Sequence, residues 1–340
     1  MKSIEKRWVI AVFLIFLLTQ TDNLYGQEQF QRSQYENIAF VINPALTGVD
    51  DEVKFVGGYR SQWSAFEYAP VNYYGGFSGT ISSLKKKFSG GRTIRLSQSQ
   101  VYGKPLNKVG EWNHGVGLYL SGDHAGPFHQ YSAYFNYAFI YSISQEYKIG
   151  FGVSADINFQ QFHDKNVAVY SADLDQVYQD YINQNRNRIE GNLNVGVSLV
   201  GHNLFLAYSI HHLTSNSNLE TVVADIDPGL YHYLIGGYNF LFSDQLTFQP
   251  SLLMGYNKYN SFTLDIQTRL KYRELLWGGL GYRHDNAAVF LLGFTIGNSL
   301  SFGYSYDYQF NEIGPYTKGT HEITLCYALY KEGKWGSVIW

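Results

Sequence analysis

Residues 299–310 read SLSFGYSYDYQF, and this stretch decides the fold class. Large apolar or aromatic residues alternate with small or polar residues along its whole length. A period of two is the period of a β-strand with one apolar and one polar face. The apolar face carries Leu300, Phe302, Tyr304, Tyr306 and Tyr308, and the polar face carries Ser301, Gly303, Ser305, Asp307 and Gln309.

The same alternation recurs at 246–256 and through most of 230–330. The links there are short and rich in turn residues, such as SDQ (243–245) and YRE (272–274), so this region is expected to form an antiparallel meander. Over the whole chain the pattern predicts fourteen strands, near 52–60, 70–81, 113–121, 130–143, 147–160, 191–200, 204–212, 230–243, 246–257, 261–272, 274–283, 286–296, 299–310 and 320–330.

Composition suggests where such a sheet would reside. Aromatic residues make up 17% of the 340 residues and charged residues only 16%, whereas soluble domains carry about 25% charge. The mean hydropathy of −0.22 excludes a bundle of membrane helices. Low charge, many aromatics and strands of about 9–13 residues together predict a transmembrane antiparallel β-barrel. A soluble β-sandwich or jelly roll is the alternative. The net charge of −3 gives no indication of a nucleic-acid partner.

The N-terminus resembles an export signal. Lys2, Lys6 and Arg7 precede an apolar run at 8–18, and this run is too short to span a membrane. We therefore expect a signal peptide over 1–26, followed by a periplasmic or plug-like segment over 27–51. The barrel is expected over 52–330 and a C-terminal tail over 331–340.

The lengths of the expected loops alternate. An even number of strands leaves both termini on one side, which export would make the periplasmic side. The short links at 144–146, 201–203, 243–245, 272–274 and 297–298 then fall in the periplasm, and the longer loops fall outside, which is the outer-membrane pattern. The basic stretch 83–110 breaks this pattern, because it falls on the periplasmic side; we interpret it as a solvated loop or a partner contact.

No catalytic, metal or cofactor motif stands out, so we expect neither enzymatic activity nor a cofactor. His211 and His212 are adjacent but have no third ligand at a recognisable spacing. Asp156, Asp265 and Arg269 fall on strand faces assigned to the lumen. We expect such charges to pair with one another and to fill the barrel.

Five stretches, in order, resemble the PorP/SprF family of type IX secretion and gliding-motility outer-membrane proteins. They are QYENIAFVINPALTG (34–48), YRSQWSAFEYAP (59–70), GLYLSGDHAGPFHQYSAYFNYAFIY (117–141), HYLIGGYNF (232–240) and LLGFTIGNSLSFGYSYDYQFNEIGPYTKGTHEITLCY (291–327).

The resemblance implies a non-catalytic outer-membrane barrel of the fourteen-stranded, long-chain fatty-acid transporter type. It also implies two kinds of protein partner besides outer-membrane lipid: an exported client with a type IX C-terminal sorting domain, which in a gliding cell can be an adhesin, and the periplasmic ring and motor subunits. The candidate partner-binding residues are Asn43, Pro44 and Ala45 near the periplasmic mouth, and Arg60, Gln62 and Trp63 at the first outer loop. If these residues are purely structural, Asn43-Pro44 forms a turn and Trp63 is an aromatic residue at the membrane–water interface.

Three functional hypotheses follow. The chain is a secretion component or client anchor, a passive transporter of small hydrophobic or polar solutes, or a membrane enzyme. A transporter requires a continuous path through the lumen. The lumen of an anchor can be filled by side chains such as those of Tyr74, Tyr134, Asp156, Asp265 and Arg269. An enzyme requires a cluster of Ser, His and acidic side chains at one rim of the barrel.

Overall fold

The structure is a computed structural model that describes residues 32–50, 53–88, 109–163, 175–176, 178–179, 187–214, 216–217, 229–243, 245–257, 262–273, 275–297, 299–330 and 339. The expected signal peptide (1–26), most of the basic stretch and most of the C-terminal tail lie outside the described residues.

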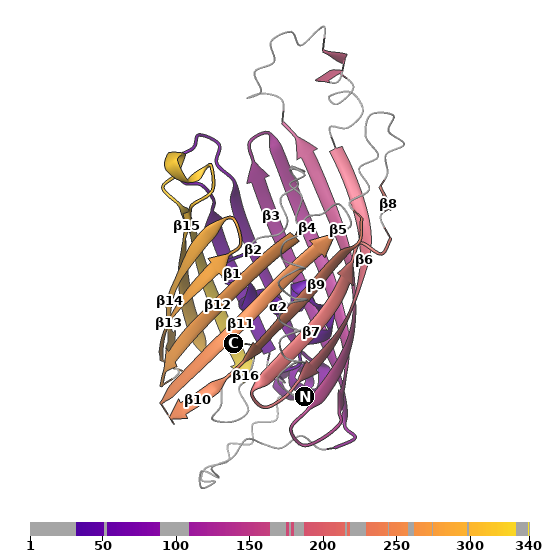
Figure 1. Cartoon of the computed structure of the whole chain (residues 1–340). Helices are drawn as coiled ribbons and strands as arrows, with labels where there is room; N and C mark the ends of the chain where they lie inside the picture. Colours follow the sequence, from indigo (N-terminus) through magenta and orange to yellow (C-terminus); the bar gives the residue numbers. More distant parts are fainter. Residues whose placement is uncertain are drawn as a thin grey trace, which may run out of the picture.

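The chain forms a closed antiparallel β-barrel (Figure 1). Each strand pairs with its sequence neighbours, and β16 closes the ring against β1. β9 and β10 are successive parts of one strand, interrupted at Asn239, because both pair with β11; β8 (Asn216–Ser217) is only a short addition to β6. The barrel therefore has fourteen strands: β1 Val53–Ser61, β2 Val71–Thr80, β3 Trp112–Ala125, β4 Phe128–Ser142, β5 Lys148–Phe162, β6 Asn187–Val200, β7 Leu204–His211, β9 Tyr231–Tyr238 with β10 Phe240–Ser243, β11 Leu246–Asn257, β12 Phe262–Tyr272, β13 Leu276–Arg283, β14 Ala287–Ile296, β15 Leu300–Gln309 and β16 Thr320–Tyr330.

Side chains alternate across the barrel wall as the sequence predicts. On β15, Gly303, Ser305 and Asp307 are buried toward the lumen, while Tyr308 is exposed on the outside. On β5, exposed Phe151, Val153 and Ile157 alternate with buried lumen residues. An apolar outside and a polar lumen define a membrane-spanning barrel. The prediction of a transmembrane barrel is confirmed, and the soluble sandwich and jelly roll are excluded. No helix among the described residues is long and apolar enough to cross a membrane.

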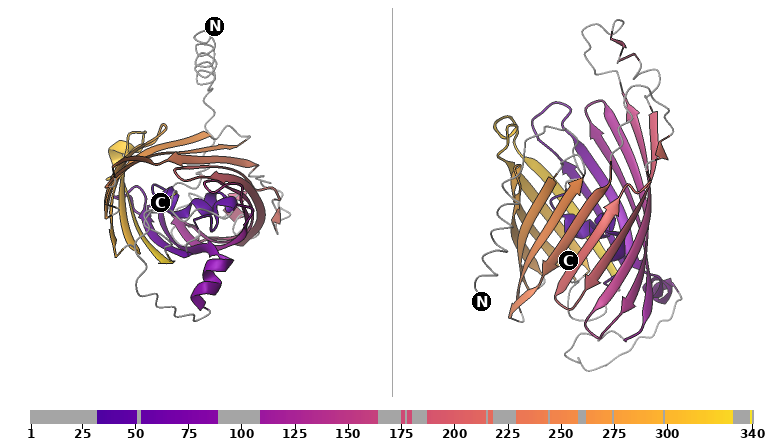
Figure 2. Two further views of the ribbon diagram at one scale, coloured as in Figure 1. Left: turned by 90° about the horizontal axis from the view of Figure 1, so that it is seen from below. Right: turned by 45° about the vertical axis from the view of Figure 1, so that its right-hand side comes forward.

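Three local predictions were wrong. Strands β3 and β4 continue through most of the expected loop 122–129 and leave only a turn at Gly126-Pro127, because their pairing extends to Ala125 and Phe128. Strand β6 begins at Asn187, four residues before the predicted start, because its first residues pair with the end of β5. Part of the basic stretch, expected to be a loop, is the helix α3 (Ile81–Phe88), which lies outside the barrel wall (Figure 2).

The two ends of the barrel differ in their connections. One end, called here the short-turn end, carries the links 143–147, 201–203, 244–245, 273–275 and 297–299, as well as the longer link with α3. The opposite end, called the long-loop end, carries the links 62–70, 126–127, 163–186, 212–230, 258–261, 284–286 and 310–319. The contrast in loop length agrees with the sequence prediction except at 126–127, 258–261 and 284–286, which are shorter than the link 143–147 at the opposite end.

Candidate functional site: the plugged lumen

The lumen holds the N-terminal segment 32–50, called here the plug (Figure 2, left). It runs through three short helices, η1 (Tyr35–Ile38), α2 (Ala39–Ile42) and η2 (Pro44–Leu46). Every plug residue except Asn37 and Asp50 is buried. The described residue of the C-terminal tail, Ile339, is buried in the same apolar cluster as Tyr35, Ile42 and Leu46. The main hydrophobic core of this barrel therefore lies inside it.

The Asn-Pro-Ala sequence of the plug builds a capped turn. The Asn43 side-chain oxygen accepts a hydrogen bond from the Ala45 amide at 2.9 Å, and Pro44 occupies the first position of η2. This is a favourable arrangement at a helix start, because the cap satisfies a free amide and proline has none to satisfy. The Asn43 amide also donates to the Val197 carbonyl on β6 at 3.2 Å. Asn43 thus fixes the turn and fastens it to the wall.

Glycines on the wall make room for this turn. A Cβ atom at Gly152 of β5 would overlap the Pro44–Ala45 backbone, and one at Gly196 of β6 would overlap the Asn43 side chain. A Cβ atom at Gly115 of β3 would overlap the Thr47 carbonyl. The plug backbone therefore occupies the space that lumen-facing side chains fill elsewhere.

Wall side chains also bind the plug backbone. Asn136 on β4 donates to the Phe40 carbonyl at 2.8 Å, and Ser209 and His211 on β7 both donate to the Ile42 carbonyl at 2.7 Å. On the opposite wall, Gln267 of β12 donates to the Ser33 carbonyl at 2.8 Å. Buried backbone groups need such partners, and the barrel supplies them from both sides.

A buried ionic network joins the start of the plug to four strands. Arg60 on β1 pairs with Asp307 on β15 at 2.9 Å and with Glu322 on β16 at 3.0 Å. Arg283 on β13 also pairs with Asp307, at 3.0 Å. The Ser33 hydroxyl of the plug donates to Asp307 at 2.6 Å, and the Ser33 amide donates to Glu322 at 2.9 Å. Buried charges are tolerated only when they are paired and hydrogen-bonded, so Ser33 helps to complete the network.

The predicted lumen residues have three kinds of partner. Asp265 pairs with Arg283 on the neighbouring strand at 2.8 Å. Arg269 pairs with Glu36 of the plug at 2.8 Å. Asp156 accepts hydrogen bonds from the amides of Asn158, Asn192 and Asn194, at 2.8, 2.9 and 2.7 Å. The structure thus brings Asp265 and Arg269 into contact with charges, and Asp156 into contact with amides.

Tyr35 fixes the plug on a further strand. Its hydroxyl lies 2.9 Å from the Ser251 hydroxyl on β11. Burial raises the pKa of the Tyr35 phenol well above its ordinary value. The phenol therefore stays neutral and able to donate to Ser251.

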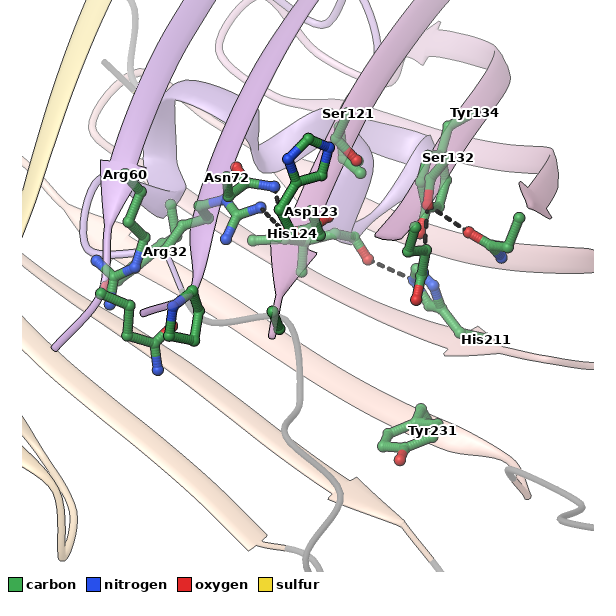
Figure 3. A pocket seen from close by; sticks show the side chains of 18 of the residues that line it. Arg32, Arg60, Asn72, Ser121, Asp123, His124, Ser132, Tyr134, His211 and Tyr231 are labelled. Atoms are coloured by element: carbon green, nitrogen blue, oxygen red, sulfur yellow. Dashed lines mark hydrogen bonds and ion pairs between the residues drawn. The ribbon is translucent and has the colours of Figure 1, made fainter. Parts of the chain in front are cut away.

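A cavity of about 390 Å³ remains between the plug and the long-loop end (Figure 3). Its walls include the outer residues of several strands, such as Val71, Ala125, His211 and Tyr231, which places its mouth at the long-loop end. Its floor includes plug residues, namely Arg32, Tyr35, Val41 and Ile42. We call this cavity the vestibule.

The vestibule has a charged side and a side that mixes aromatic and polar groups. Arg32 lies 3.7 Å from Asp123, and the Asn72 amide donates to Asp123. Figure 3 shows these residues on one side of the cavity, with Ser132, Tyr134 and His211 on the other. Such a mixture suits a polar ligand with an apolar face better than a hydrocarbon.

Comparison with known proteins identifies the family. The family model for the type IX secretion system membrane protein PorP/SprF matches residues 24–327. The chain belongs to this family. The match includes the plug and nearly all of the barrel, so both are parts of the PorP/SprF domain. No curated protein matches the chain.

Solved structures with a similar fold are distant in sequence from this PorP/SprF chain. The Ralstonia pickettii toluene transporter TbuX is 9% identical, with 85% of this chain and 92% of that chain covered, at a TM-score of 0.46. The monoaromatic hydrocarbon channel CymD is 12% identical, with 89% and 94% covered, at 0.46. The Acinetobacter baumannii outer membrane protein Omp33 is 8% identical, with 82% and 100% covered, at 0.44.

The candidate partner-binding residues divide into two groups. Asn43, Pro44 and Ala45 are buried inside the barrel, and Arg60 is only 2% exposed within the ionic network. A partner at either end cannot touch Asn43, Pro44 or Ala45 while the plug is seated, so partner contact there stays a prediction that requires the plug to move. Arg60 borders the vestibule, and partner contact at Arg60 also stays a prediction. Gln62 and Trp63 are half-buried in the link 62–70.

The sequence analysis missed most of the plug's partners. Asp307, Glu322 and Arg283 stand at polar positions of predicted strands, and that position could have marked them as lumen residues. Ser33 and Glu36 carry no comparable signal, because the plug has no strand period. Among the described residues, no group of three or more His, Cys, Asp or Glu side chains could hold a metal ion, and His211 is engaged with the plug backbone.

Proposed function

We propose that this PorP/SprF-family barrel is a non-enzymatic outer-membrane component of the type IX secretion system. It supports the secretion or cell-surface attachment of proteins that carry type IX C-terminal sorting domains. The observation that carries the proposal is the seated plug. Contacts from β4, β5, β6 and β7 on one side and from β1, β12, β15 and β16 on the other hold it in the lumen. A barrel filled in this way suits a scaffold better than a conduit.

The orientation follows from the loops and the strand count. In this proposal the signal peptide exports the chain, and the start of β1 and the end of β16, which lie at the same end of the fourteen-stranded barrel, both face the periplasm. The short-turn end, with helix α3, then faces the periplasmic ring and motor subunits, and the long-loop end faces the medium, where an exported client is held.

A passive transporter is the second candidate, favoured by the vestibule. A cavity of about 390 Å³ is large enough for a small solute. Its floor is made partly of plug residues, however, and conduction through the barrel would require the plug to move aside.

The experiment is a pull-down of the tagged, full-length protein from native outer membranes, analysed by mass spectrometry. An unrelated outer-membrane barrel with the same tag is the control. We expect specific recovery of a large exported protein with a type IX sorting domain, or of the ring and motor subunits. Recovery of the barrel alone, together with steady ion conductance in planar bilayers, would contradict the proposal and support a transporter.

A further inference from the structure

Two loops at the long-loop end are joined to each other by hydrogen bonds. They are 62–70, between β1 and β2, and 310–319, between β15 and β16, and Figure 1 shows the latter with its helix η4 (Gly314–Tyr316) at the upper edge of the barrel. The Ser64 amide donates to the Gly319 carbonyl at 2.9 Å, and the Lys318 amide donates to the Ser64 carbonyl at 2.8 Å. The Trp63 amide donates to the Thr320 hydroxyl at 3.1 Å. The pairing of β1 with β16 thus continues into the loops. We call this pair of loops the rim knot.

The rim knot contains strained backbone. Trp63, Ala65 and Tyr68 have φ angles of 51°, 98° and 60°. Residues with a Cβ atom rarely adopt positive φ, and the value at Ala65 lies outside even the left-handed helical region. Such strain persists only where surrounding contacts enforce it, and it concentrates at functional sites. In the rim knot, hydrogen bonds to 318–320 hold Trp63 and Ser64, and the Tyr68 carbonyl accepts a hydrogen bond from the Gly126 amide at 3.3 Å.

The strained backbone presents aromatic side chains to solvent. Phe66 is 43% exposed, Tyr68 58% and Tyr316 74%. Each aromatic side chain can bury roughly 150–250 Å² in a contact, and aromatic anchors dominate the energetics of protein interfaces. Glu67 and Glu312 are exposed in the same two loops. Lys318 is exposed in the loop 310–319 as well, so the surface fits a partner with an apolar depression bordered by charged residues of both signs.

The position of these rings favours a protein partner over lipid. Tyr59, Tyr73 and Tyr308 are exposed near the ends of their strands, where interfacial aromatics meet lipid headgroups. Phe66, Tyr68 and Tyr316 lie beyond the strand ends, in loops that hydrogen bonds hold in one conformation. A fluid headgroup layer requires no such fixed geometry, whereas a preorganised loop lowers the entropy cost of binding a folded protein.

We propose that the rim knot is the docking surface for the exported client, with Phe66, Tyr68 and Tyr316 as its anchors. The inference rests on the proposed function and names the surface that performs it. Gln62 and Pro70 belong to the rim knot and also line the vestibule, so a client docked here lies beside the vestibule mouth.

The test compares client recovery from native outer membranes by full-length variants. The triple variant F66S/Y68S/Y316S removes the three anchors. The control variant F128S/L213S removes two exposed apolar side chains at the same end, one at the start of β4 and one in the link 212–230. Folded barrel is measured in parallel by its mobility shift on heating, and client recovery is expressed per folded barrel.

We expect the triple variant to recover at most about one tenth of the wild-type amount of client, because it has lost the anchors of the interface. The control variant should recover as much client as the wild type. Wild-type recovery by the triple variant would overturn the docking surface while leaving the proposed function intact. If the triple variant gave less folded barrel but recovered the same amount of client per folded barrel, the docking surface would also be overturned. The three aromatic side chains would then be membrane contacts. Absence of any client from the wild-type sample would overturn the proposed function, and the docking inference with it.

Discussion

Glu36 of the plug and Arg269 of β12 form an ion pair at 2.8 Å, and both side chains are fully buried. The Arg269 guanidinium also lies 5.2 Å from the centre of the Trp277 ring, which is within range of a cation–π contact. This pair joins a segment outside the sheet to a strand more than 200 residues later in the chain. It is a direct link between the seated plug and the barrel wall.

Removing the plug's partner in this pair should destabilise the protein. Glu36→Ala leaves Arg269 buried without its carboxylate, and breaking a buried pair costs about 3–5 kcal/mol. We expect a corresponding decrease in the free energy of unfolding, measured by urea titration in lipid vesicles. The double variant E36L/R269M removes both charges and should recover most of the loss. Equal stability of Glu36→Ala and the wild type would contradict the role assigned to the pair.

A methyl group at Gly152 should displace the plug. Gly152→Ala places a Cβ atom against the Pro44–Ala45 backbone, whereas Gly75→Ala, the matched control, meets its nearest atom only at 3.8 Å. Thr47→Cys in a Cys326→Ser background reports on the plug, because Thr47 is 0% exposed. We expect fast maleimide labelling of that cysteine with Gly152→Ala and slow labelling with Gly75→Ala. Equal rates would show that the wall glycines do not seat the plug.

The Asp156 carboxylate should be sensitive even to an isosteric change. It accepts three amide hydrogen bonds, and asparagine would replace one acceptor oxygen with a donor that faces other donors. Unmade buried hydrogen bonds cost about 1–3 kcal/mol, so Asp156→Asn should lower the free energy of unfolding by about that amount. Asp285→Asn is the control, because the Asp285 side chain is 83% exposed. An unchanged unfolding midpoint for Asp156→Asn would argue against the amide cluster.

Relaxing the strain in the rim knot should stabilise the barrel. Ala65→Gly removes the Cβ atom from a residue with a φ of 98°, and strain of this kind costs on the order of 1–3 kcal/mol. Part of the gain is lost to the greater freedom of glycine in the unfolded chain. We expect a higher unfolding temperature for Ala65→Gly than for Ala125→Gly, a control at a strand end. A lower temperature would mean that the Ala65 conformation is not strained.

Much of the fold could be predicted because a barrel strand carries its own signal. In Leu300–Gln309 every second residue faces lipid, and lipid tolerates only apolar side chains, so the period of two is visible in the sequence itself. The tight turn at Gly126-Pro127 was missed because Asp123 and His124 are polar and suggested a loop, whereas both residues continue the strand. Helix α3 was missed because three lysines in succession also suit a solvated loop.

Little of the plug could be predicted. Its contacts depend on which strands face which part of the lumen, and local periodicity does not contain that information. Ser33 and Asp307 are 274 residues apart in sequence, and neither belongs to a motif that indicates the other. Arg60 could be assigned to the lumen from its strand position, but its two acidic partners could be found only once β1 was known to lie beside β16.

The surface proteome of the native cells tests the proposed role in secretion most directly. Intact cells with and without the gene for this chain would be treated with protease, and the released peptides quantified by mass spectrometry. We predict that at least one exported protein with a type IX C-terminal sorting domain disappears from the surface without the chain and returns when the chain is restored. An unchanged surface proteome, with all such proteins present at wild-type levels, would contradict the account.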